Sequence, residues 1–303
     1  MANTFATVPA TSYNKHDYVM RMRARVNKPS TWKDVLNVKI SDVRTIVNAY
    51  MSTEPSVVTG TRGTAYNYED FTVTPDQLVI SLTKMIPMFI DEADRIQQSW
   101  VDQMGIADFQ GKKIDEKIEA LTLAKHGDWT DFGVTDLSNT GADDTTQITV
   151  SAANIDDIIR AVKRKLYTNN GVEFAVEKGI FFVWRPEDFE LLEAFVQANG
   201  FTEADISLKN GIPVQKAFRY MGVDHYLSTQ HTANHVFCGI KRMYEIGILR
   251  GTFGSVKFIE DPASGTGAAA SSSLSGLGIV SRLDYGFNNP TQLAEFFIDL
   301  NVV

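Results

Sequence analysis

The sequence has little cysteine and no long apolar run. Its one cysteine, Cys238, cannot form a bridge within the chain, which excludes a disulfide-built secreted domain and favours a reducing compartment. Residues 1–25 contain no apolar block of signal-peptide length. The strongest apolar run, Ile180–Trp184, is far shorter than the roughly 20 residues that span a bilayer. We therefore expect a soluble protein that uses no standard export signal and no membrane.

The motifs of nucleotide binding and hydrolysis are also missing. Gly265-Thr-Gly267 and Gly276-Leu-Gly278 lie in a small-residue stretch. Neither has the following Lys-Ser/Thr of a phosphate loop or a third glycine in dinucleotide register. No Gly-x-Ser-x-Gly elbow is present to anchor a Ser-His-Asp hydrolase. We expect no catalytic residue and no cofactor.

Basic charge is scarce overall but concentrated near the N-terminus. The chain has 29 Lys and Arg against 37 Asp and Glu, a net charge of -8, so its whole surface cannot bind nucleic acid phosphates. Arg21, Arg23 and Arg25 alternate with methionines in a segment without sustained periodicity. We interpret residues 1–35 as an extended arm whose arginines contact either phosphates or, as the acidic composition favours, an acidic neighbouring subunit.

Two extended stretches joined by a long polar segment predict a projecting hairpin over residues 36–86. Leu36, Val38 and Ile40 alternate with polar residues, and a second alternating stretch runs from Phe71 to Leu82. The segment between them contains Gly60-Thr61-Arg62-Gly63, with Tyr66 and Tyr68 beyond it. A two-stranded hairpin is marginally stable in water by itself, so we expect this one to lie against another chain.

A long helix is predicted to follow Pro87. Apolar residues recur at helical spacing from Phe89 through Trp100, and the stripe resumes at Ile114. One unbroken helix over residues 90–125 would measure about 54 Å, whereas the whole chain as a sphere would be about 50 Å across. The sequence thus predicts a break near Gly105 or Gly111, or an elongated subunit. We favour a long, bent helix along an elongated subunit.

The acidic residues Asp91, Glu92 and Asp94 lie at the predicted start of this helix. They suit the positive end of the helix dipole, which we favour over a divalent cation site.

The remaining pattern mixes separate helices with mostly antiparallel strands, so the fold class is α+β. We expect helices over residues 151–166 and after Pro186, with a small-residue loop over 263–278. The predicted strands are Ile180–Trp184, Val223–Leu227, His235–Ile240 and two alternating stretches within 279–302.

The best metal candidate in the sequence is His231-x3-His235-x2-Cys238. The surrounding residues indicate a strand, in which positions four apart lie about 13 Å from each other. A loop histidine pair and a buried cysteine are therefore favoured, and no metal site is expected. A metal-dependent hydrolase that uses His231, His235 and Asp224 is a distant alternative.

The order of these parts resembles the major capsid protein of tailed phages, the Hong Kong 97-type fold. The resemblance rests on Phe89-Ile-Asp-Glu-Ala-Asp94, Phe182-Val-Trp-Arg-Pro-Glu-Asp-Phe189, His235-Val-Phe-Cys-Gly-Ile-Lys241 and Ser281-Arg-Leu-Asp-Tyr-Gly-Phe287. It implies five parts in chain order: an N-terminal arm, an extended hairpin loop, a peripheral domain with a long spine helix, an axial domain, and C-terminal strands that return to the sheets. Their limits would be 1–35, 36–86, 87–170, 171–275 and 276–303.

The resemblance also implies a structural role without enzymatic activity. Copies would assemble as hexamers and pentamers into an icosahedral virion capsid around double-stranded DNA that is not bound sequence-specifically. Assembly would occur in the host cytoplasm with portal and scaffolding proteins. Together with the interpretations above, it suggests these inter-subunit contact residues: Arg21, Arg23, Arg25, Gly60, Thr61, Arg62, Gly63, Tyr66, Tyr68, Asp91 and Asp94.

Two further alternatives remain open from the sequence. An encapsulin-type nanocompartment resembles the same fold but holds a cargo enzyme, and the long basic arm favours the phage version. A tail or neck protein would form rings or tubes instead of closed shells.

Overall fold

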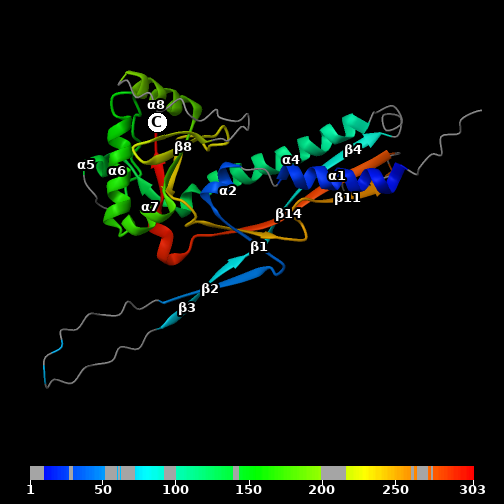
Figure 1. Ribbon diagram of the computed structural model, residues 1–303, viewed down its shortest axis with the longest axis horizontal. Helices are drawn as coiled ribbons and strands as arrows, with labels where there is room; N and C mark the ends of the chain where they lie inside the picture. Colours follow the sequence, from blue (N-terminus) through cyan, green and yellow to red (C-terminus); the bar gives the residue numbers. More distant parts are fainter. Residues whose placement is uncertain are drawn as a thin grey trace, which may run out of the picture.

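The chain is elongated and contains two main sheets that lie toward its two ends (Figure 1). The computed structural model describes residues 10–26, 30–51, 60, 62, 72–91, 100–138, 143–198, 216–260, 263–264, 272–273 and 276–303. A six-stranded sheet lies at one end, a long sheet with two helices at the other, and a hairpin projects from the middle. The predicted elongated subunit is confirmed.

The six-stranded sheet has the order β5-β15-β9-β6-β8-β7. Its strands are β5 (Thr130–Phe132), β6 (Ile180–Trp184), β7 (Lys216–Tyr220), β8 (Val223–Leu227), β9 (His235–Ile240) and β15 (Phe297–Asn301). The pairs β5–β15 and β6–β8 are parallel and the others antiparallel. Every residue of β6 is buried, as its run of apolar residues predicts.

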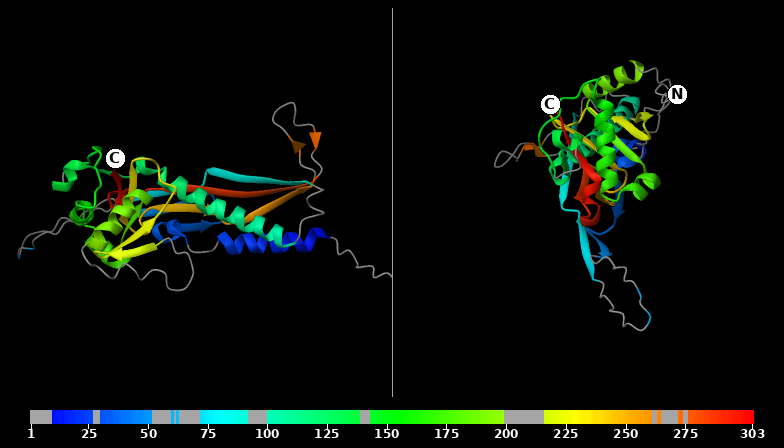
Figure 2. Two further views of the ribbon diagram at one scale, coloured as in Figure 1. Left: turned by 90° about the horizontal axis from the view of Figure 1, so that it is seen from above. Right: turned by 90° about the vertical axis from the view of Figure 1, so that its left-hand side faces the viewer.

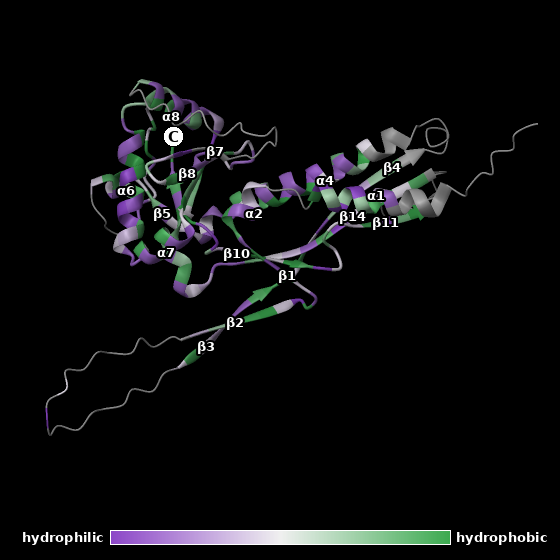
Figure 3. Cartoon of the chain, in the orientation of Figure 1, coloured by the Kyte–Doolittle hydropathy of each residue, from purple (hydrophilic) through white to green (hydrophobic). Residues whose placement is uncertain are grey.

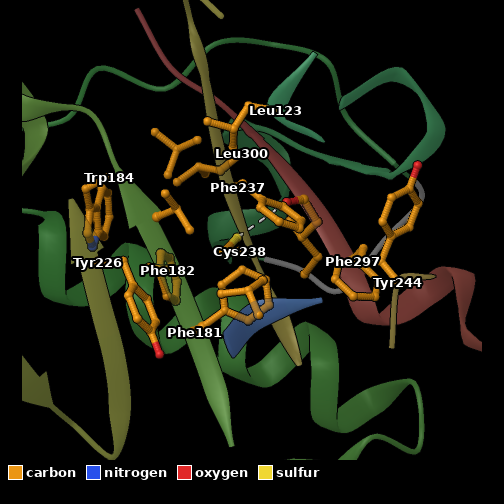
Figure 4. Packing of buried hydrophobic residues seen from close by; sticks show 14 of the residues in the cluster. Leu123, Phe181, Phe182, Trp184, Tyr226, Phe237, Cys238, Tyr244, Phe297 and Leu300 are labelled. Carbon is orange, nitrogen blue, oxygen red and sulfur yellow. Dashed lines mark hydrogen bonds between the residues drawn. The ribbon is translucent and has the colours of Figure 1, made fainter. Parts of the chain in front are cut away.

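Helices α6 (Ile155–Thr168), α7 (Val172–Lys178) and α8 (Pro186–Ala198) pack beside this sheet. The predicted helices over 151–166 and after Pro186 are confirmed, whereas α7 was not predicted. The core of the sheet is aromatic (Figure 4). Phe237 lies between Trp129, stacked at 3.9 Å between ring centroids, and Phe181, edge-on at 4.9 Å. Such pairs add about 1 kcal/mol each to the gain from burial.

The long sheet has the order β1-β10-β14-β11, with β4 also paired to β14. Its strands are β1 (Asn37–Ser41), β4 (Leu82–Asp91), β10 (Glu245–Leu249), β11 (Ser255–Glu260) and β14 (Gly276–Asn288). Helices α1 (Ala10–Val26) and α4 (Trp100–Leu123) cover one of its faces (Figure 2). Gln110 of α4 joins the layers, because its Oε1 accepts hydrogen bonds from Tyr18 of α1 and Ser281 of β14, both at 2.9 Å.

The predicted helix start at Pro87 is wrong. Residues 82–91 form β4, which pairs with β14 along its whole length. The described helix α4 begins at Trp100, and residues 92–99 lie outside the described part of the chain. Its 24 residues measure about 36 Å. It continues through Gly105 and Gly111, so neither glycine breaks it.

The predicted extended conformation of the arm is also wrong for residues 10–26. Residues 10–26 form the helix α1, because Tyr18, Met22 and Val26 recur every four residues on one buried face. That face packs on the long sheet and α4, so α1 belongs to the body of this chain.

Smaller elements connect these parts. They are α2 (Thr31–Val35), η1 (His126–Asp128), α5 (Val134–Ser138), η4 (Thr291–Phe296), and the short pair β12 (Ala263–Ser264) and β13 (Ser272–Ser273). Each of the two sheets contains strands from more than one of the predicted domain segments. The limits of those segments stay a prediction. None of the helices in the described ranges is long and apolar enough to cross a membrane.

Candidate functional site

The most prominent feature of the surface is the hairpin formed by β2 (Thr45–Met51) and β3 (Val73–Val79). The strands are antiparallel, with Thr45 opposite Val79 and Met51 opposite Val73. The hairpin extends away from both sheets (Figure 1). This confirms the predicted projection, but the first predicted strand, β1, pairs with β10 in the long sheet and forms no part of the hairpin.

One face of the hairpin is exposed and uncharged. Exposure alternates along both strands, and the odd-numbered positions are the exposed ones, with mostly aliphatic residues. The colours of the hairpin in Figure 3 show that hydrophobic and hydrophilic residues are mixed along it. Val47 and Val73 are 58% and 51% exposed. The residues of this hairpin face are Thr45, Val47, Ala49, Val73, Pro75, Gln77 and Val79. An uncharged strip of this kind is typical of a surface that another protein covers.

The base of the hairpin is fixed to the long sheet. Leu78 and Ile80 are buried there against Gly247 of β10, where an added Cβ would lie 2.8 Å from the Leu78 side chain. Only a glycine admits this close approach without a shift. Glu245 adds a polar clamp, since it pairs with Lys39 at 2.5 Å and accepts a hydrogen bond from Asn48 of β2 at 2.8 Å. These contacts set the direction in which the hairpin points.

The predicted contact residues at the hairpin tip are only partly described. Gly60 and Arg62 are both exposed. Thr61, Gly63, Tyr66 and Tyr68 lie outside the described residues.

The three arginines of the predicted arm lie on α1, and two of them pair within this chain. Arg21 binds Asp108 of α4 at 2.6 Å, and Arg25 lies 3.4 Å from Asp115 of the same helix. Arg23 is exposed. Arg21 and Arg25 are four residues apart, as are the buried Tyr18 and Met22, and this spacing is typical of a helix. The alternation of Arg and Met in the sequence obscures that signal.

Of the acidic residues predicted at the helix start, Asp91 does not lie at the start of a helix. Asp91 is the last residue of β4, opposite Gly276, and Asp94 lies outside the described residues.

The long sheet leaves one face open, opposite α1 and α4. On β4, Met85 and Phe89 are 55% and 40% exposed and share this face with Pro87. In the pairing of β4 with β14, Met85 lies opposite Arg282 and Phe89 lies opposite Gly278. This surface combines exposed apolar side chains with the ion pair of Arg282 and Asp284, and like the hairpin face it lacks a covering element within the described chain.

The histidines singled out in the sequence do not form the predicted sets. Cys238 is buried, and its thiol donates to the carbonyl of Ile298 at 3.7 Å. Burial raises the pKa of that thiol. Asp224 lies on β8, two strands away from β9 in the sheet order, and pairs with Lys241 at 2.8 Å. His235 instead contacts Asp299 and His126, neither of which the sequence pattern indicated.

Comparison with known proteins gave a clear result only at the level of structure. No family model and no curated protein matches the chain, whereas 159 chains of solved structures do. The mature capsid of bacteriophage PhiM1 has a TM-score of 0.57 at 13% identity, over 91% of this chain and 88% of that chain. The structure of Gordonia phage Cozz has a TM-score of 0.58 at 11% identity, over 91% of this chain and 88% of that chain. A virus-like particle from Pyrococcus furiosus has a TM-score of 0.53 at 9% identity, over 95% of this chain and 99% of that chain.

These identities carry no information on individual residues, but the similarity extends over most of each chain. The elongated body, the long helix on an open-faced sheet and the projecting hairpin together identify the architecture as the Hong Kong 97-type fold of tailed-phage capsid proteins.

Proposed function

We propose that the chain is the major capsid protein of a tailed phage, a structural protein that assembles as hexamers and pentamers into a shell around double-stranded DNA. The observation that carries this proposal is the hairpin. It extends beyond the body of a chain with a capsid-type fold and exposes an uncharged face. Ordering each of its residues costs about 1 to 2 kcal/mol, and within the described chain only its base packs on the body. Sister subunits would supply the missing contacts.

The proposed partner of the hairpin face is an adjacent copy of the chain. The hairpin would lie across the neighbour's α4 region, as the loop of the same fold is expected to do. Gly60 and Arg62 are exposed near its tip, available for such contacts. The pairing of Arg21 and Arg25 with α4 of their own chain leaves Arg23 as the arginine of the predicted arm that would reach a neighbour.

The acidic composition supports an interior that does not bind DNA tightly. A shell with dense positive charge would bind packaged DNA through release of counterions and slow its entry and exit. With a net charge of -8, the chain would enclose DNA without sequence-specific contacts. We further propose assembly in the host cytoplasm with portal and scaffolding proteins, no enzymatic activity, and the five domain segments given above.

Deletion of residues 56–68 tests the proposal. All the described strands lie outside these residues, so the deleted chain should fold with the thermal stability of the wild type. It should remain as free subunits or capsomers under electron microscopy. Intact shells from the deletion variant would refute the proposed role of the hairpin, and a wild type that never forms particles would refute the function itself.

An encapsulin-type compartment is the second candidate, favoured by the match to a virus-like particle along nearly the whole of both chains. Purified particles that contain protein cargo and no DNA would select this alternative. Packaged DNA would select the phage capsid.

A further inference from the structure

A polar cluster lies at one end of the six-stranded sheet, away from the hairpin and the open sheet face. His126 comes from η1, His235 from the start of β9 and Asp299 from β15. Nδ1 of His235 lies 2.8 Å from Oδ2 of Asp299, and Nδ1 of His126 lies 3.3 Å from the same oxygen. All three side chains offer a ligand atom within 4.8 Å of the others. Three segments far apart in sequence thus converge on one point.

The electrostatics of the cluster call for positive charge. Asp299 is 1% exposed, and Asp131 lies directly opposite it on the neighbouring strand β5. Two carboxylates therefore lie beside two imidazoles.

Two basic side chains near the cluster, Arg185 and Lys165, are engaged with other groups. Arg185 binds Asp188 through Nε at 2.6 Å. Lys165 contacts the side chains of Asp136 and Asp143, and it reaches Asp131 only at the backbone carbonyl, at 2.9 Å. A divalent cation would balance the two carboxylates without displacing either pair.

We propose that His126, His235 and Asp299 bind a divalent transition metal, with zinc as the best match. Two imidazoles and one carboxylate are donors that zinc accepts in tetrahedral sites with an open fourth position. At metal–ligand distances of about 2.1 Å, tetrahedral ligands lie about 3.4 Å apart. The 3.3 Å between His126 and Asp299 already fits this spacing, and the 2.8 Å between His235 and Asp299 must lengthen slightly.

Binding requires one change in geometry. The two imidazole rings are stacked, with centroids 3.7 Å apart and an interplanar angle of 21°. Their lone pairs therefore lie in nearly parallel planes and do not converge. His126 is the ring that can turn, because its side chain is 28% exposed and stands on a single turn of 3-10 helix. The metal would then tie the end of α4 to the six-stranded sheet through η1.

The experiment uses the full chain, stripped with a chelator and titrated with cobalt(II) and then zinc. We expect one cobalt per chain with the intense visible absorption of a tetrahedral site, and displacement by one equivalent of zinc. His126→Ala and Asp299→Asn should each weaken zinc binding by more than about 100-fold, beyond the loss typical of outer partners. His16→Ala, which removes a histidine from α1, is the matched control and should bind zinc like the wild type.

Several outcomes would overturn the proposal. These are no cobalt spectrum at millimolar metal, binding that survives both cluster variants, or binding that His16→Ala abolishes. Because His126 is partly exposed, His126→Ala should fold normally, and a circular dichroism spectrum identical to that of the wild type checks this.

Discussion

At the residue scale, two glycines in the same helix have opposite roles. Gly111 lies where α1 crosses α4, and a Cβ added there would approach Cγ of Arg25 to 2.7 Å and Cβ of Arg25 to 2.9 Å. Gly105 has no neighbouring atom within 4 Å of an added Cβ. Gly111 therefore permits helix contact, whereas Gly105 only weakens the helix.

Substitution of each glycine by alanine separates these roles. Gly105→Ala should raise the free energy of unfolding by about 0.5 to 1 kcal/mol through helix propensity. Gly111→Ala gains the same propensity but must push Arg25 away from α4, and overpacking of this kind costs about 1 to 3 kcal/mol. We expect a net loss of roughly 1 kcal/mol, measured by urea unfolding. Equal stabilisation by both variants would show that α1 does not pack tightly at Gly111.

A buried histidine should make the fold acid-sensitive. His225 is fully buried, and its Nδ1 accepts a hydrogen bond from the indole of Trp184 at 2.9 Å. Burial lowers its pKa to about 3. The folded-state pKa lies below the unfolded value of about 6.5, so His225 stabilises the fold fully above pH 6.5 and this contribution is lost as the pH falls toward 3.

The loss should reach about 1.4 kcal/mol per pH unit between pH 6.5 and 4. His225→Gln keeps an acceptor for Trp184 but does not titrate. We expect the variant to show a shallower fall of unfolding free energy over this range in denaturant titrations at several pH values. An identical slope in wild type and variant would assign the acid sensitivity to other groups.

At the element scale, the sequence predicted the elements whose signal is local. The apolar run of β6 and the Pro-started α8 needed no tertiary information, and both were found where expected. For the residues after Pro87 the sequence predicts a helix, because Phe89 fits the helical spacing that leads to Trp100, and only the pairing with β14 selects a strand. The cluster around Asp299 was unpredictable for the same reason, since it depends on how β15 pairs with β5 and β9.

The short helix α2 is held to the six-stranded sheet by one buried lysine. Nζ of Lys241 lies 2.9 Å from Asp34 of α2 and 2.8 Å from Asp224 of β8, and it donates to the hydroxyl of Tyr226 at 2.6 Å. Removal of one partner from a buried charge network leaves the others without compensation.

Lys241→Met should therefore lower the free energy of unfolding by roughly 3 kcal/mol, measured by urea unfolding. Arg160→Met is the matched control, because the Arg160 side chain is 59% exposed and pairs on α6 with the exposed Asp157 as well as with Asp156. Its loss should cost less than about 0.5 kcal/mol. Similar costs for the two variants would mean that the Lys241 network adds nothing beyond an exposed ion pair.

At the scale of the whole molecule, the chain separates stability from assembly. The described core packs within one copy, whereas the uncharged hairpin face and the exposed Met85 and Phe89 of the long sheet lack a covering element in the described structure. Substitutions on the hairpin face should therefore change assembly without changing the stability of the subunit.

The double variant Val47→Glu with Val73→Glu tests this separation. Both side chains are exposed, so the melting temperature should stay within a few degrees of the wild type. Burial of two carboxylates under a neighbouring subunit would cost several kcal/mol at each of many repeated contacts, and closed particles should disappear in sedimentation and electron microscopy. The matched control, Val47→Thr with Val73→Thr, keeps the β-branched shape without charge and should still form shells. Normal shells from the glutamate variant would mean that the hairpin face stays in contact with water after assembly, and the contacts that close the shell would then have to come from the open sheet face.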